Sequence, residues 1–79
     1  MSNEIIGKFL LKLYEKTGDN EVGYFDKYDI GEEIGLLDKT QTDHVVENLV
    51  KDGFVNNDTQ GSKIKITEEG NKRLRNNQI

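Results

Sequence analysis

Apolar side chains near the N-terminus recur at the spacing of one face of a helix. Their positions are Ile6, Phe9, Leu10, Leu13 and Tyr14, and charged residues lie between them. Alternating steps of three residues and one residue place these side chains on one side of an α-helix. Gly18 follows within a polar run and suits the left-handed conformation that ends many helices. The pattern predicts a first helix over residues 3–17.

Residues 21–28 carry a weaker pattern. Val22, Tyr24 and Phe25 either form a strand of two or three residues or simply cover the open side of the core. Periodicity does not decide between these alternatives, because the apolar run is too short.

A second helix is expected over residues 29–36, with Asp26 or Asp29 as its N-terminal cap. Its inward positions are Ile30, Ile34 and Leu37. Two glycines weaken this helix by about 1 kcal/mol each relative to Ala, so it depends on tertiary contacts. We expect Gly31 to permit close approach of another helix and Gly35 to end the helix.

The clearest amphipathic pattern covers residues 40–51. Its buried stripe is predicted to be Thr42, Val45, Val46, Leu49 and Val50. Its outward positions are Gln41, Asp43, His44, Glu47, Asn48 and Lys51. Asp38 or Thr40 can cap the start of this third helix, and Gly53 follows it as a stop signal.

A hairpin of two strands follows the third helix. One strand begins at Phe54, and its partner is residues 63–66, where Lys and Ile alternate with Ile64 and Ile66 facing inward. The seven residues 56–62 between them are polar and longer than a tight hairpin loop needs. This loop is the candidate wing of the molecule.

A last helix is predicted from residue 68 to about residue 76. Thr67 can cap it, and Leu74 is its clearest inward residue. Acidic residues at its start and basic residues at its end complement the helix dipole.

Length and composition favour one small α+β domain, mostly α, over residues 1–79. Apolar residues make up 33% of the chain, so the core is thin, and the absence of Cys excludes disulfides and thiolate metal sites. No apolar run approaches the ~20 residues of a membrane span. The N-terminus lacks the basic segment and apolar stretch of a secretion signal, so we expect a cytoplasmic protein without membrane contact.

Charge is unevenly distributed along the chain. The net charge is −4, but residues 1–62 carry six Lys against thirteen Asp and Glu, whereas residues 63–79 carry five Lys and Arg against two Glu. Attraction to a polyanion must therefore come mainly from the last quarter. Its cations are Lys63, Lys65, Lys72, Arg73 and Arg75.

Three motifs in this order resemble the winged helix-turn-helix family, in particular the multiple-antibiotic-resistance and phenolic-acid repressor types. Residues 29–36 (Asp-Ile-Gly-Glu-Glu-Ile-Gly-Leu) resemble its second helix, and residues 46–55 (Val-Glu-Asn-Leu-Val-Lys-Asp-Gly-Phe-Val) resemble the end of its third. Residues 66–74 (Ile-Thr-Glu-Glu-Gly-Asn-Lys-Arg-Leu) are similar to the segment after the wing. The resemblance covers nearly the whole chain and implies a three-helix core, a two-stranded wing and a short C-terminal helix.

The resemblance also implies a transcriptional regulator whose third helix enters the major groove of double-stranded DNA. The residues implied to read base edges are Gln41, His44 and Asn48. Those implied to contact phosphate or a thymine methyl are Thr40 and Thr42. Those implied to bring the wing to the DNA are Gln60, Ser62, Lys63 and Lys65. Phosphate contacts at the two ends of the helix are implied for Lys39 and Lys51.

The charge of the third helix departs from the family pattern. DNA-binding members usually carry Arg or Lys on this face, whereas this chain has Asp43 and Glu47 there and Asp58 at the wing tip. Carboxylates facing phosphates lower affinity, so the alternative function is a winged-helix protein–protein interaction module. Cations of residues 63–79 on the same face as the third helix favour DNA binding, and cations pointing away favour the interaction module.

Other chemistry has little support in the sequence. His44 is the only His and has no Cys partner, so neither a metal site nor a cofactor is expected. No nucleophile constellation or Gly-rich phosphate loop is present, which argues against an enzyme. The aromatic residues around residues 14–28 either close the thin core or form a homodimer surface; they are Tyr14, Tyr24, Phe25 and Tyr28. A homodimer is expected of a DNA-binding protein this small, because a single domain contacts only a few base pairs.

Overall fold

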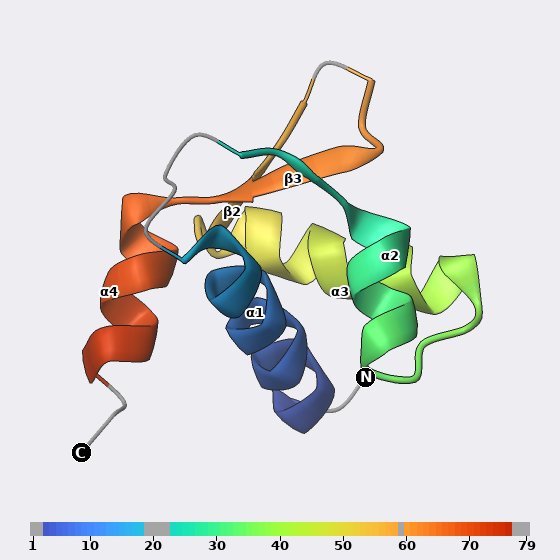
Figure 1. Ribbon diagram of the computed structural model, residues 1–79, viewed down its shortest axis with the longest axis horizontal. Helices are drawn as coiled ribbons and strands as arrows, with labels where there is room; N and C mark the ends of the chain where they lie inside the picture. Colours follow the sequence, from blue (N-terminus) through green and yellow to red (C-terminus); the bar gives the residue numbers. More distant parts are fainter. Residues whose placement is uncertain (1–2, 19–22, 59, 77–79) are drawn as a thin grey trace.

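Four helices and three short strands follow one another in the part of the chain that the computed structural model describes, residues 3–18, 23–58 and 60–76 (Figure 1). Their bounds are α1 Asn3–Thr17, β1 Phe25–Asp26, α2 Lys27–Glu33, α3 Lys39–Lys51, β2 Val55–Asn57, β3 Lys63–Ile66 and α4 Glu68–Asn76. The chain is therefore an α+β structure in which helix predominates, as its sequence predicts.

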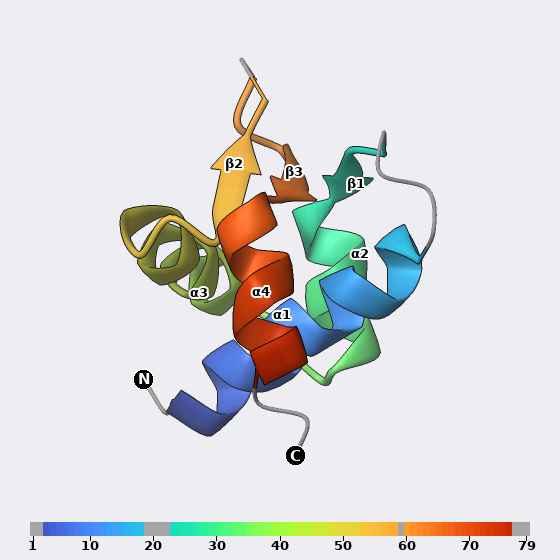
Figure 2. The ribbon, with the colours of Figure 1, turned by 90° about the vertical axis from the view of Figure 1, so that its left-hand side faces the viewer.

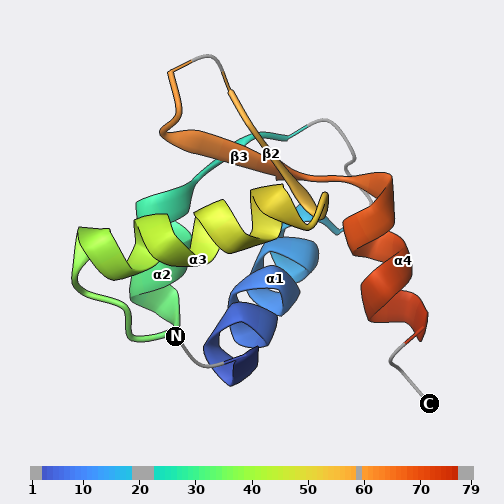
Figure 3. The same cartoon turned by 180° about the vertical axis from the view of Figure 1, so that it is seen from behind.

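The sheet has three antiparallel strands in the order β1-β3-β2. Phe25 pairs with Ile64, and Val55 pairs with Ile66. The predicted hairpin thus gains a third strand, and the short-strand alternative for residues 21–28 is confirmed at Phe25, whereas Val22 lies outside the described residues. The sheet lies along one side of the helices, while α3 and α1 cross beneath it (Figures 1 and 3).

The core forms where α1, α2 and α3 meet the inner face of the sheet. Its buried apolar residues are Phe9, Leu10, Leu13, Ile30, Leu36, Val45, Val46, Leu49, Val55, Ile64 and Ile66. The predicted inward faces of the first and third helices and of the Lys-Ile strand are confirmed, because these residues belong to them. Ile6, Val50 and Leu74 are only partly buried and pack against this core.

The second helix begins and ends earlier than predicted. It covers Lys27–Glu33 because the Asp26 carboxylate accepts a hydrogen bond from the Tyr28 amide at 2.8 Å and caps the helix. Gly35, with φ +90°, turns the chain away after Glu33. Leu37 is consequently 82% exposed, and Leu36 is buried in its place. The expectation that Leu37 faces inward was wrong, because the helical register does not continue to that residue.

The other predicted helix ends follow the expected chemistry. The Asp38 carboxylate accepts from the Thr40 amide at 2.9 Å and caps α3, and Gly53 ends it with φ +83°. The Thr67 hydroxyl accepts from the Gly70 amide at 3.0 Å and caps α4. Side-chain oxygens thus satisfy amide groups that the helices leave without a partner.

Gly31 and Thr42 form the closest approach between α2 and α3. A Cβ placed on Gly31 would collide with the Thr42 Oγ1 atom, which confirms the predicted role of this glycine. The Thr42 side chain is 1% exposed, and its hydroxyl has no hydrogen-bond partner within the described residues. A buried hydroxyl without a partner costs about 1–3 kcal/mol.

Replacing Thr42 with Val is therefore expected to stabilise the protein by about 1 kcal/mol, because the shape is kept and the unpaired hydroxyl is removed. Urea unfolding measures the change. Thr17→Val is the matched control, since the buried Thr17 hydroxyl donates to the Leu13 carbonyl at 2.8 Å. The Thr17→Val variant should lose about 1 kcal/mol of unfolding free energy, because it removes that hydrogen bond. Equal losses in both variants would contradict the difference between the two hydroxyls.

Candidate nucleic-acid interface

The side of α3 opposite the core presents a row of polar side chains to solvent. We call this row the outer face of α3, and it consists of Thr40, Gln41, His44, Glu47, Asn48 and Lys51, all exposed. Figure 3 views the molecule from the side on which α3 lies in front. The Asn48 amide nitrogen donates to the His44 carbonyl at 2.9 Å, which leaves its carbonyl oxygen and one N–H for another partner.

Thr42 does not belong to this face. The resemblance implied a contact with phosphate or a thymine methyl, but the side chain is buried and faces Gly31 on α2. Thr42 also lies on the apolar stripe of the helix, and burial takes it out of reach of a ligand on the outer face. The implied contact of Thr42 was therefore wrong.

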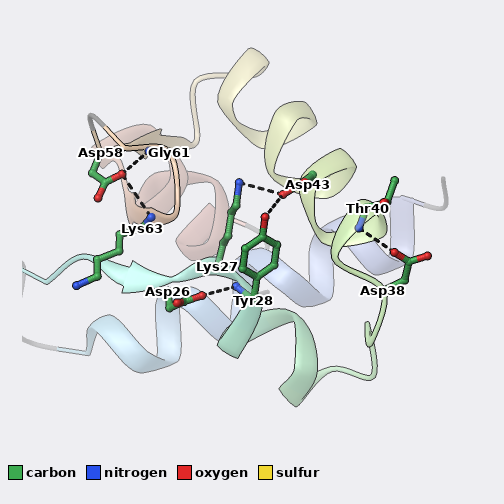
Figure 4. A network of polar contacts seen from close by, with 9 residues as sticks. All are labelled: Asp26, Lys27, Tyr28, Asp38, Thr40, Asp43, Asp58, Gly61 and Lys63. Carbon is green, nitrogen blue, oxygen red and sulfur yellow. Dashed lines mark hydrogen bonds and ion pairs between the residues drawn. The ribbon is translucent and has the colours of Figure 1, made fainter.

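Asp43 is held by two side chains from the start of α2 (Figure 4). The Lys27 ammonium lies 2.9 Å from one carboxylate oxygen, and the Tyr28 hydroxyl donates to the same oxygen at 2.9 Å. The side chain of Lys27 is only 14% exposed and that of Asp43 is 40% exposed. Asp43 was expected to point outward, but these contacts turn its charge towards α2 and pair it.

The three groups stabilise one another's charge states. The hydrogen bond from Lys27 holds the pKa of Asp43 below its usual range, against the effect of partial burial, and the Tyr28 hydrogen bond adds to it. Partial burial acts to lower the pKa of Lys27, but the hydrogen bond and charge of Asp43 outweigh it, so the pKa is raised. The hydrogen bond to Asp43, with some desolvation, raises the pKa of Tyr28. At neutral pH the cluster is an ion pair with a neutral phenol donor.

Replacing Asp43 with Asn should destabilise the protein by about 1 kcal/mol at neutral pH, a value that allows for solvent screening of a partly exposed pair. The pKa of Asp43 is lower in the folded than in the unfolded protein. Its contribution to the free energy of unfolding is therefore complete at pH values above the unfolded pKa of about 3.9, and it is lost as the pH falls through the folded pKa. The difference in unfolding free energy between wild type and variant should therefore shrink in acid. Glu32→Gln removes an exposed carboxylate that forms no ion pair among the described residues, and it serves as the matched control for the change of charge. A difference for Asp43→Asn that stays constant into strong acid would contradict the pairing.

Asp58 also has a structural role at the turn between β2 and β3 (Figure 4). One of its carboxylate oxygens accepts from the amides of Gln60 at 3.1 Å and Gly61 at 2.6 Å. The side chain of Gln60 is exposed, while Ser62 is half-buried and its carbonyl accepts from the Lys27 amide at 3.1 Å. The acid at the tip thus shapes the turn that presents Gln60.

The cations of the last quarter do not gather on the outer face of α3. Lys65 and Arg75 line a groove with the C-terminal turn of α1. Figure 2 shows that turn and α3 on opposite sides of α4. The side chain of Lys63, which is exposed, points away from α3 in Figure 4. The placement of these three cations counts towards the interaction module, whereas the pairing of Asp43 by Lys27 counts towards DNA binding.

The remaining cations lie near other side chains. Lys72 is 4.0 Å from Glu68 on the same helix, and the Arg73 guanidinium lies 5.9 Å from the ring centre of Phe54, just beyond α3. The Lys39 ammonium lies 5.0 Å above the ring of Tyr28, at the start of α3. Lys39 and Arg73 therefore flank the two ends of α3, and Lys51 lies in its last turn.

The aromatic residues divide between the core and the surface. Tyr14 and Phe25 are half-buried against the core, and Tyr28 supports Asp43. Tyr24 is 48% exposed. This distribution favours core closure for Tyr14 and Phe25.

Lys27 is a neighbour of α3 that the sequence pattern did not reveal. Its side chain crosses from the first turn of α2 to Asp43, a contact between elements that no periodic pattern encodes. The pair Lys27-Tyr28 directly after a capping Asp is the signal nearest to it in the sequence.

Neither a metal cluster nor a membrane-spanning helix is found among the described residues. In that part of the chain, no group of three or more His, Asp or Glu is placed to hold a metal ion. Each described helix is too short or too polar to cross a bilayer. Comparison of the chain with models of protein families, with curated proteins and with solved structures finds no match.

Proposed function

We propose that this chain is a winged-helix DNA-binding protein that acts as a transcriptional regulator in the cytoplasm. In this proposal α3 is the recognition helix and the turn between β2 and β3 is the wing. The observation that carries it is the pairing of Asp43 with Lys27, which removes one of the two acids that argued against the outer face of α3. Glu47 is then the one acid of the outer face.

The outer face offers the groups that base edges require. Gln41 and Asn48 carry amides, which pair with adenine through two hydrogen bonds, and His44 can donate to guanine. Lys39 and Lys51 stand at the two ends of the helix, where they can meet phosphates. Acting as a homodimer, the protein would read two half-sites, since one domain spans only a few base pairs.

Few cations flank α3, so the salt dependence of binding should be shallow. About two or three phosphate contacts correspond to a slope of about −2 to −3 in log affinity against log salt. Fluorescence anisotropy of a labelled duplex at several salt concentrations measures this slope. No binding at tens of micromolar protein in low salt, with circular dichroism showing a folded chain, would contradict the proposal.

A second candidate function is a winged-helix interaction module that binds a protein partner. The observation that favours it is the position of Lys65 and Arg75 on the side away from α3. Affinity capture from a cell extract separates the two functions. Recovery of nucleic acid without any stoichiometric protein partner would count against the interaction module.

A further inference from the structure

A groove lies on the side of the molecule away from α3. It has a volume of about 610 Å³ and runs between the C-terminal turn of α1, strand β3 and helix α4. Tyr14 lines it from α1, Gly18 from just after that helix, Ile66 from β3, and Asn71 from α4. Volumes of this size are typical of sites for small organic molecules.

Two cations line this groove without a partner among the described side chains. Lys65 reaches it from β3 and Arg75 from the last turn of α4, and neither forms an ion pair or hydrogen bond with another described side chain. The acid in the lining, Glu68, lies 4.0 Å from Lys72. Among the described side chains, the groove thus presents two cations and one acid that lies beside another cation, and concave surfaces of this charge concentrate anions.

The groove also offers apolar contact beside the cations. The Tyr14 side chain is half-buried, and Ile66 is 5% exposed beneath the groove surface. The hydroxyl of Thr17 is already committed to the Leu13 carbonyl. Asn71, half-buried, adds an amide. The groove therefore brings together two cationic side chains, an amide and an aromatic ring.

We propose that this groove binds a small organic anion, in which a phosphate or carboxylate group is joined to a planar apolar body. The anionic group contacts Lys65 and Arg75, and the body lies against Tyr14. Arg presents a planar fork of donors that suits both phosphate and carboxylate oxygens. The groove and the outer face of α3 are separate surfaces, so this site stands independently of DNA binding.

Chemical-shift titration of isotope-labelled, full-length protein tests the site with three probes: phenyl phosphate, phthalate and inorganic phosphate. Saturable shifts at millimolar or lower concentration, centred on Tyr14, Lys65 and Asn71, are expected with phenyl phosphate or phthalate. The tighter of these two identifies the anionic group. Inorganic phosphate should bind more weakly, because it has no body to cover Tyr14, and equal affinity would overturn the role of the apolar wall.

Charge variants separate a site from a diffuse ion atmosphere. Lys65→Gln and Arg75→Gln should each weaken binding about tenfold, the size of one charge-assisted contact. Lys51→Gln makes the same change of net charge on α3 and should leave the affinity unchanged. Shifts that fail to saturate, or an equal loss for Lys51→Gln, would overturn the proposal. Because the readout is direct binding to the groove, its failure is distinct from a failure to bind DNA.

Discussion

Gly31→Ala is expected to destabilise the protein by about 1–3 kcal/mol, although Ala is the better helix former. The added methyl group would collide with the Thr42 hydroxyl and lie 3.3 Å from its Cγ2 atom. Thr42 is 1% exposed, so the close packing around it opposes movement of its side chain away from the added methyl group. The expected cost therefore falls on the packing of α2 against α3, and urea unfolding measures it.

Gly7→Ala is the matched control for this substitution. Gly7 is an exposed helical residue of α1, and a Cβ added there would have no neighbouring atom within 4 Å. Ala at this position should therefore stabilise the protein by about 0.5–1 kcal/mol. Thr42→Ala should rescue most of the loss in a double variant with Gly31→Ala. If Gly31→Ala proves as stabilising as Gly7→Ala, the close approach of α2 and α3 is contradicted.

Glu47→Lys is expected to raise the affinity for duplex DNA about tenfold at low salt and to steepen the salt dependence by about one phosphate contact. Glu47 is exposed in the middle of the outer face of α3, and it has no ion pair among the described residues. A cation at this position can meet a phosphate, whereas the native carboxylate repels one. Anisotropy titrations at several salt concentrations measure both changes.

Glu15→Lys gives the same change of net charge on α1, away from the outer face of α3. Glu15 is exposed and forms a surface pair with Lys12 at 3.3 Å, so its loss should cost little stability. This control should alter DNA affinity by much less than Glu47→Lys. Equal gains in the two variants would mean that net charge, and not the position of α3, governs the association.

The regular parts of the structure were predictable because local chemistry determines them. Apolar spacing marked α1 and α3, strict alternation marked β3, and Asp, Thr and Gly marked the helix ends. Tertiary packing determined the bounds of α2, which local chemistry left open. Asp26, not Asp29, capped α2, and Gly35 broke the register before Leu37. A choice between two nearby caps depends on packing that neither residue encodes by itself.

The electrostatics of the candidate site were harder to predict than its position. Sequence places Asp43 on the polar side of α3, but it does not show that Lys27 and Tyr28 reach it from another helix. Nor does strand alternation show that Lys65 shares a groove with Arg75. Both features arise between elements, where charge depends on distance in space and not along the chain.

Chemical-shift mapping of the full chain with a short duplex DNA at low salt tests the role of α3 most directly. The proposed function predicts that the largest shifts fall on Gln41, His44 and Asn48 and on the turn at Gln60. Shifts confined to the groove of Lys65 and Arg75, or no shifts with folded protein, would contradict α3 as the DNA-binding element.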